Sequence, residues 1–173
     1  CLDILHGDFE QTSFHGRHTM ERNFQRTEIT HVNQVIGSRR GASSHQYNPA
    51  VILAERDATE DAGSCYGMVF AYSGNFMCEA EKDQFDNTRV LMGLQSDLFH
   101  YPLEKEESLI VPETILTYSG KGFAELSNRY HRCIRNHIFR GKYQKQPKPI
   151  LINSWEAFYF DFTGEKIYQL AKE

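Results

Sequence analysis

Three side chains that follow an apolar run near the end of the chain have the chemistry of a binding or catalytic site. Residues 149–154 lead directly into Trp155 and Glu156, and Asp161 follows a few positions later. Carboxyl groups can act as general acids, general bases or nucleophiles. An indole ring can cover the apolar C–H face of a sugar while it keeps water away. Trp155 is therefore our main candidate for a binding residue, with a core Trp that fills the end of a fold as the alternative.

The two carboxylates are weaker candidates than the indole. Glu156 and Asp161 are five residues apart, which places them on opposite faces of a strand because strand side chains alternate. Hydrogen bonding to nearby loop backbone is the interpretation that we favour for both. The sequence thus predicts no catalytic residue in this segment.

Other polar residues do not form a metal or phosphate motif. The segment from Ser38 to Pro49 contains two Arg and a His, but it has no glycine-rich cradle and no adjacent helix start. We expect a structural loop at a domain or subunit interface. His131 and His137 lie six apart, on different faces of a predicted helix, and the eight histidines show no metal-ligand spacing. We therefore predict no metal site.

The cysteines favour free thiols over a disulfide scaffold or a zinc ribbon. They are widely spaced and include no CxxC pair, at Cys1, Cys65, Cys78 and Cys133. Buried free thiols are typical of proteins in a reducing compartment. We expect a cytoplasmic protein.

Composition excludes two classes of partner. The net charge is −4, so the chain lacks the basic field that binding to nucleic acid or an anionic membrane requires. No apolar run approaches the roughly 20 residues of a membrane span. The chain also starts with Cys1 and shows no signal pattern, from which we expect it to be cut from a longer protein.

The elements that must position Trp155 begin with a long β region over residues 1–120. Strands are predicted at 66–72, 76–81, 88–94 and 113–118, with turn residues at short intervals between them. The turn at 73–75 predicts a hairpin between the first two of these strands. This spacing is typical of an antiparallel β-sandwich and not of βαβ units.

The pattern changes after Gly120. Apolar residues recur at helical spacing from Phe123 to Phe139, so a linking helix is expected there, ended by Gly141. A basic, Pro-containing connector follows to residue 148. The helix and the connector together form a second predicted region over 121–148. The run 149–155 is typical of a strand buried on both faces, and 164–172 of a helix, so 149–173 predicts the first βα unit of an α/β domain.

Five stretches, taken together, resemble the bacterial α-galactosidases of glycoside hydrolase family 36. The strongest is Pro149 to Phe162, with its N-x-W-E-A-x-x-F-D-F pattern. The others match in the same order and with the same spacing, so that the resemblance extends along most of the chain: 38–49, 66–76, 87–93 and 112–119.

The resemblance implies a fold and an activity. The fold is the later part of an N-terminal β-supersandwich, followed by the opening unit of a (β/α)₈ barrel. The activity is retaining hydrolysis of terminal α-galactosyl groups from raffinose, stachyose and melibiose, without metal or cofactor, by a homo-oligomer that is often a tetramer. Such hydrolysis requires two carboxyl groups about 5 Å apart. Both are aspartates on later barrel strands in this family, and neither motif occurs here, so we expect the chain alone to be inactive.

Two site residues follow from the resemblance. The family's tryptophan at the position of Trp155 lines the galactose pocket. Many members carry G-x-W-x-R-E-R in the sandwich, whose Trp reaches a neighbouring subunit's pocket, and here His18 and Met20 replace its Trp and first Arg. His18 can still stack on or hydrogen-bond a sugar. An exposed loop histidine is the alternative.

A second class of function also fits the β region. A free-standing β-sandwich that binds carbohydrate or mediates assembly would need no catalytic carboxylates. The strand predicted at 149–155 argues against it, because such a module has no use for a barrel strand.

Overall fold

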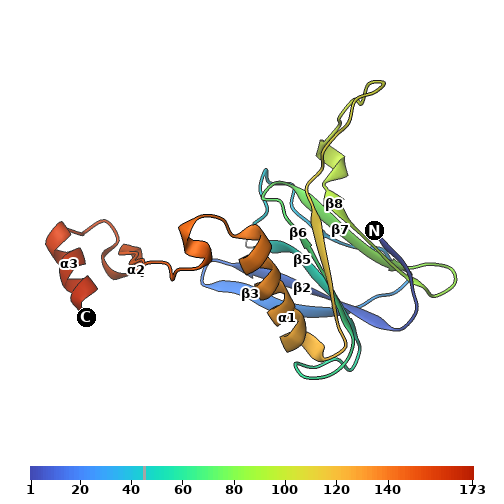
Figure 1. Ribbon diagram of the computed structural model, residues 1–173, viewed down its shortest axis with the longest axis horizontal. Coiled ribbons are helices and arrows are strands. Elements are labelled where there is room, and N and C mark those ends of the chain that lie inside the picture. The colour runs from blue at the N-terminus through green and yellow to red at the C-terminus, as the bar shows by residue number, and fades with distance from the viewer. Residues whose placement is uncertain (45) are drawn as a thin grey trace. The chain divides into compact units, whose positions relative to one another are not determined.

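The computed structural model describes residues 1–44 and 46–173 of the chain (Figure 1), with the side chain at position 98 also left out. The described residues divide into two compact units, Cys1–Arg132 and Cys133–Glu173, and each is described by itself. No helix in the described part of the chain is long and apolar enough to cross a membrane.

The first unit is a β-sandwich followed by a helix, as the sequence predicts. Its described strands are β1 (Leu2–Leu5), β2 (Phe9–Arg17), β3 (Met20–Glu28), β4 (Gln34–Gly37), β5 (Tyr47–Glu55), β6 (Cys65–Phe70), β7 (Phe76–Lys82), β8 (Thr88–Leu94) and β9 (Thr114–Ser119). They form a four-stranded sheet in the order β1-β8-β7-β4 and a five-stranded sheet in the order β3-β2-β5-β6-β9. Every pairing between these strands is antiparallel.

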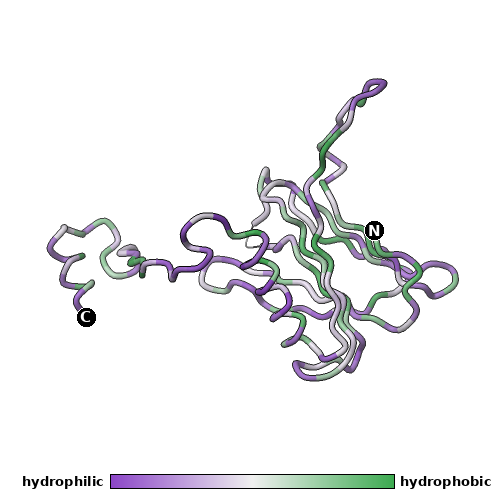
Figure 2. The backbone as a smooth tube through the Cα atoms, viewed as in Figure 1, coloured by the Kyte–Doolittle hydropathy of each residue, from purple (hydrophilic) through white to green (hydrophobic). Residues whose placement is uncertain are grey.

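The core lies between the two sheets. Leu53 on β5 and Met68 on β6 meet Cys78 on β7 and Val90 on β8, and all four side chains are buried. Figure 2 shows apolar residues along these strands and polar residues in the connections. Because each strand alternates its side chains, one face of each sheet supplies this core and the other face remains for further packing.

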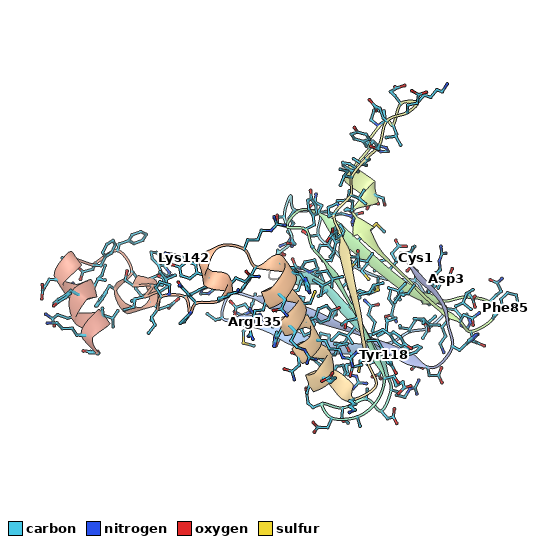
Figure 3. All side chains as sticks on the ribbon, in the orientation of Figure 1. Cys1, Asp3, Phe85, Tyr118, Arg135 and Lys142 are labelled. Carbon is cyan, nitrogen blue, oxygen red and sulfur yellow. The ribbon has the colours of Figure 1, made fainter. Side chains whose placement is uncertain are left out.

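Helix α1 (Gly122–Cys133) covers the outer face of the five-stranded sheet. Its Phe123 and Leu126 are buried against Ala54 and Cys65. Its first N–H groups donate to carbonyls of the 59–63 loop, which satisfies donors that lack partners within the helix. Further along the helix, Arg129 Nη1 donates to the carbonyl oxygen of Tyr118 on β9 (2.8 Å). Tyr118 is labelled in Figure 3.

The predicted hairpin between β6 and β7 is wrong, although both strands exist. β6 pairs with β5 and β9, whereas β7 pairs with β4 and β8 in the other sheet. Packed sheets lie about 10 Å apart, and a five-residue connection extends roughly 16 Å, so residues 71–75 can cross between them. Both strands bury an apolar face, and opposite sheets let both faces meet in one core.

The second unit contains short helical segments. α1 ends in a π-helical turn, η2 (Ile134–Ile138), and a 3₁₀ turn, η3 (Lys142–Gln144), follows Gly141, whose φ is +76°. α2 (Trp155–Phe158) and α3 (Gly164–Lys172) complete the unit. The helices predicted from Phe123 and over 164–172 are confirmed.

The strand predicted at 149–155 does not form among the described residues. Residues 149–154 have no regular secondary structure, and Trp155 begins α2. Ile150 and Leu151 are 96% and 91% exposed. A strand needs neighbours that pair with its backbone and cover its side chains, and the described residues provide none for this segment.

Candidate functional site

The turn between β2 and β3 presents His18 to solvent. His18 and Thr19 connect Arg17 to Met20, and Thr19 has a φ of +67°. The Thr19 N–H donates to Glu21 Oε1 (3.0 Å), and Arg17 Nη1 donates to the His18 carbonyl oxygen (3.2 Å). These local hydrogen bonds shape the turn and leave the imidazole on its exposed surface.

A β-bulge at Gly16 sets the position of this turn. The pairing of β2 with β3 shifts between His15 and Arg17. The Gly16 N–H donates to the carbonyl oxygen of Gln46, so the base of the turn is tied to the segment before β5 (3.2 Å). Bulges re-aim the side chains beyond them.

A hollow of about 330 Å³ lies beside the turn and is rich in hydrogen-bond donors. It is lined by His15, Gly16, Arg17, Met20, Asn23, Arg40 and Gln46. Guanidinium and amide N–H groups can donate to hydroxyl oxygens of a polar partner. The surface therefore suits contact with a ligand or protein partner, and it lacks the carboxyl pair that glycoside chemistry requires.

Of the segment from Ser38 to Pro49, residues 38–44 and 46 form a structural loop, as predicted, whereas Tyr47 to Pro49 belong to β5. Ser43 N–H donates to the Ser73 carbonyl oxygen (2.8 Å), and Gly41 N–H donates to Asn75 Oδ1 (2.7 Å). Arg39 forms an ion pair with Asp97. The two hydrogen bonds fasten the loop to the crossing between β6 and β7, and the ion pair joins it to the segment after β8. Residue 45 lies outside the described residues, and the predicted interface role stays a prediction.

Trp155 lies in a small aromatic cluster of the second unit. Its ring meets Tyr159 edge to face (5.4 Å between centroids, 80°) and Phe160 (4.9 Å, 90°). The Trp155 backbone N–H donates to Asn153 Oδ1 (2.9 Å). The side chain is 43% exposed, so the indole keeps accessible surface for a ligand.

The two carboxylates beside Trp155 differ in their surroundings. Asp161 Oδ2 forms an ion pair with Lys166 Nζ (3.0 Å), and the same Nζ donates to the Asp161 carbonyl oxygen (3.0 Å). This contact joins Asp161 to the first turn of α3 at an exposed position, and the predicted hydrogen bonding of its carboxylate to loop backbone stays a prediction. Glu156 is an exposed residue of the first turn of α2.

The structure does not join the two predicted binding residues into one site. His18 belongs to the first unit and Trp155 to the second, so each is described only within its own unit. Within the residues that the structure describes, no three or more His, Cys, Asp or Glu side chains are grouped to hold a metal ion.

Sequence reasoning missed one set of polar residues. Gln11, Ser13 and His15 alternate along β2 and face a cavity between the two sheets, where Gln25 and Thr27 of β3 join them. The signal was a strand with polar residues at every second position, on the face opposite Phe14.

Two family models together match almost the whole chain. Residues 1–104 match the N-terminal domain of glycosyl hydrolase family 36, and residues 108–173 match the melibiase family.

Curated relatives match the chain from end to end. The bifunctional alpha-galactosidase/sucrose kinase AgaSK of Mediterraneibacter gnavus is 61% identical over 173 residues, which are 100% of this chain and 18% of that protein. The alpha-galactosidase AgaA of Geobacillus stearothermophilus is 40% identical over 171 residues, which are 99% of this chain and 24% of that protein. The chain therefore spans less than a quarter of the length of these relatives.

Solved structures of similar proteins have the same fold over this region. The galactosidase domain of AgaSK superposes with a TM-score of 0.90 at 61% identity, covering 99% of this chain and 24% of that one. A variant of AgaA from Geobacillus stearothermophilus in complex with raffinose gives a TM-score of 0.90 at 40% identity, with the same coverage of each chain. Another AgaA variant, in complex with stachyose, matches equally well.

Proposed function

The chain belongs to glycosyl hydrolase family 36, and from this premise we propose that it is part of a retaining α-galactosidase. The enzyme would remove terminal α-galactosyl groups from raffinose, stachyose, melibiose and related oligosaccharides. The observation that supports this proposal most is the identity of 61% and 40% to two alpha-galactosidases over essentially the whole chain. Complexes of AgaA with raffinose and stachyose support the substrate class.

The chemistry would come from residues outside this chain. Retaining hydrolysis uses one carboxylate as nucleophile and a second carboxyl group as acid and then base. We assign both to parts of the relatives that this chain does not span. Glu156 and Asp161 take no part in the reaction, and the 173 residues by themselves would be inactive.

Trp155 would bind the galactosyl group. Its indole has the apolar face that a sugar's C–H groups need, and 43% of its side chain is open to a ligand. By covering the sugar it would exclude water from the reacting carbon, which strengthens the electrostatic interactions there.

The exposed segment before Trp155 would become a barrel strand in the longer protein. Ile150 and Leu151 are almost fully exposed here, and contiguous exposed apolar residues mark surfaces that pack against something else. Neighbouring strands and helices would supply the missing backbone partners and cover these side chains. The indole would then project from the C-terminal end of the strand, where barrel enzymes bind their substrates.

His18 would act at the outer part of the substrate site, presented by the β2–β3 turn. In a homo-oligomer such as a tetramer, this turn would reach the site of a neighbouring subunit. The support is its exposure at the tip of a hairpin fixed by Gly16, with hydrogen-bond donors beside it.

Hydrolysis assays on the full-length protein test the proposal. We expect galactose release from raffinose, stachyose and melibiose by the full-length protein and none by residues 1–173 alone. Absence of galactose release from all three sugars would overturn the assignment. Clear micromolar binding of galactose or raffinose to residues 1–173, measured by calorimetry, would instead favour a carbohydrate-binding module.

A further inference from the structure

A cavity of about 480 Å³ lies between the two sheets of the sandwich. Its walls come from β2, β3 and β5 of one sheet and from β4 of the other. The lining residues are Gln11, Ser13, His15, Gln25, Thr27, Gln34, Val35, Ile36 and Tyr47. Neither His18 nor Trp155 contributes to it. Cavities of this size hold small organic ligands.

The strand pairing brings the polar residues together. Ser13 lies opposite Gln25, and Gln11 lies opposite Thr27 in the β2–β3 register. The next pair along the two strands, Phe14 and Phe24, points to the other face of the sheet and lines the apolar space beside α1. The alternation of side chains along β2 and β3 thus places several polar residues, and not just one, on the face toward the sandwich interior.

Gln11 is the most deeply buried polar residue of the lining. It is only 3% exposed, and its Oε1 has no hydrogen-bond partner among the described residues. A buried acceptor without a donor destabilises a fold, because it has lost its water without a replacement. An apolar side chain of similar size would avoid this penalty, and Gln11 instead places a polar amide in the buried wall of the cavity.

The lining defines the chemical class of that ligand. It offers amides from Gln11, Gln25 and Gln34, together with hydroxyl groups and an imidazole, but no Asp, Glu, Lys or Arg. Such groups donate and accept without carrying charge, which suits a neutral molecule with many hydroxyl groups.

An apolar wall completes the cavity. Val35, Ile36 and the Tyr47 ring provide it, and Tyr47 is held edge to face by His15 (5.3 Å, 63°). A sugar presents apolar C–H groups as well as hydroxyl groups, and an aromatic ring can pack against those C–H groups.

We propose that this inter-sheet cavity binds a neutral saccharide through Gln11, Gln25 and Tyr47. The site goes beyond the proposed function, because it uses residues of the sandwich that the hydrolytic role does not require. Gln11 forms part of the buried polar wall, and hydroxyl groups of the sugar bind Gln25 and Thr27 at the exposed rim.

Hydrogen exchange measured by mass spectrometry on the full-length protein tests the site. Raffinose is the probe, with labelling for seconds in the cold so that little of it is hydrolysed. We expect raffinose to slow exchange in β2, β3 and β4. The same protection should persist in a His18→Ala variant, which would separate the cavity from the hairpin turn.

Two variants and a control complete the experiment. Gln11→Met should raise the raffinose concentration that gives half of this protection about tenfold. It should also raise the melting temperature of the sugar-free protein, because it removes the unpaired acceptor. Gln25→Ala, at the exposed rim, should raise the same raffinose concentration about fivefold without a folding defect. Gln169→Met, on the exposed face of α3, is the matched control and should change neither quantity.

The outcomes separate this site from the proposed function. If raffinose protects β2, β3 and β4 in a protein that fails to release galactose, the proposed saccharide site stands and the α-galactosidase proposal is overturned. Galactose release without protection, or protection that Gln11→Met and Gln25→Ala leave unchanged, would overturn the cavity. Occupation of the cavity by water or by another segment of the full-length protein would appear as absence of protection.

Discussion

The carbonyl oxygen of Met20 lies across the β2–β3 hairpin from Gly16, 2.6 Å from the point where a Cβ on Gly16 would stand. The Cα of Glu21 is similarly close to that point, at 2.7 Å. Both contacts are with backbone, which cannot rotate away as a side chain can. Glycine at position 16 therefore permits the close strand approach that places the turn with His18.

Gly16→Ala should displace this turn and destabilise the sandwich. We expect a loss of about 1–3 kcal/mol in the free energy of unfolding, because the backbone must shift to admit a methyl group. Urea unfolding measures the loss. Gly93→Ala on β8, where an added Cβ meets nothing within 4 Å, is the control and should be nearly neutral. Equal stability of the two variants would contradict the role of the close approach.

Replacing His18 by the family's Trp should improve use of the longer substrate. An indole offers more stacking surface than an imidazole, so His18→Trp should lower the KM for raffinose about threefold to tenfold. The KM for a small aryl α-galactoside should change little, since this residue is proposed to contact the outer part of the substrate. His18→Ala should raise the raffinose KM. Identical raffinose KM values for all three proteins would remove His18 from the site.

Trp155→Ala should reduce kcat/KM for raffinose about 10- to 100-fold in the full-length enzyme, because the galactosyl group loses its apolar cover. Trp155→Phe should retain part of the activity, since a smaller ring can still stack. Tyr168→Ala, at an exposed position of α3, is a control for removing an aromatic ring from the same unit. A Trp155→Ala enzyme with full activity would show that the indole is only a packing residue.

The buried thiols should be unreactive in the folded protein. Burial raises the pKa of the Cys65 thiol to about 11 and that of Cys78 to about 12, and both side chains have no exposed surface. At pH 8 iodoacetamide should modify exposed Cys1 and spare Cys65 and Cys78 until urea unfolds the chain. Mass spectrometry of the modified peptides counts the sites. Rapid modification of Cys78 in the native protein would contradict the buried core.

The same thiols predict a loss of stability in alkali. Both folded pKa values lie above the ordinary value near 8.5, so the unfolded chain loses these protons first as the pH rises. The stabilisation is complete below about pH 8 and disappears as the pH rises through the folded pKa values. Urea unfolding at pH 8 and pH 10, with Cys65→Ala as the control, measures the contribution.

The sequence predicted β6 to β9, α1 and α3 because their signals are local, but it predicted no separate bounds for β1 to β5. Strand-forming residues between turn residues identified the four strands, and helical spacing identified α1. The pairing partners of β6 could not be predicted from local signals. A turn at Ser73 to Asn75 fits both a hairpin and a crossing between sheets, and only the distant partners β5, β9, β4 and β8 decide between them.

The site was predictable only in part, for a related reason. Trp155 and His18 were chosen from residue type and from the family pattern, but their surroundings depend on contacts distant in sequence. The strand expected before Trp155 failed because Ile150 and Leu151 need neighbours that the described residues do not provide. The cavity at Gln11 was invisible because it needs the register of β2 on β3 together with the second sheet.

A crystal structure of the full-length protein with raffinose bound would test the central claim most directly. We predict residues 149–154 as a strand hydrogen-bonded on both sides, with the Trp155 indole packed against the galactosyl ring at about 4 Å. A segment that remains without strand neighbours, or an indole that is turned away from the sugar, would contradict the account.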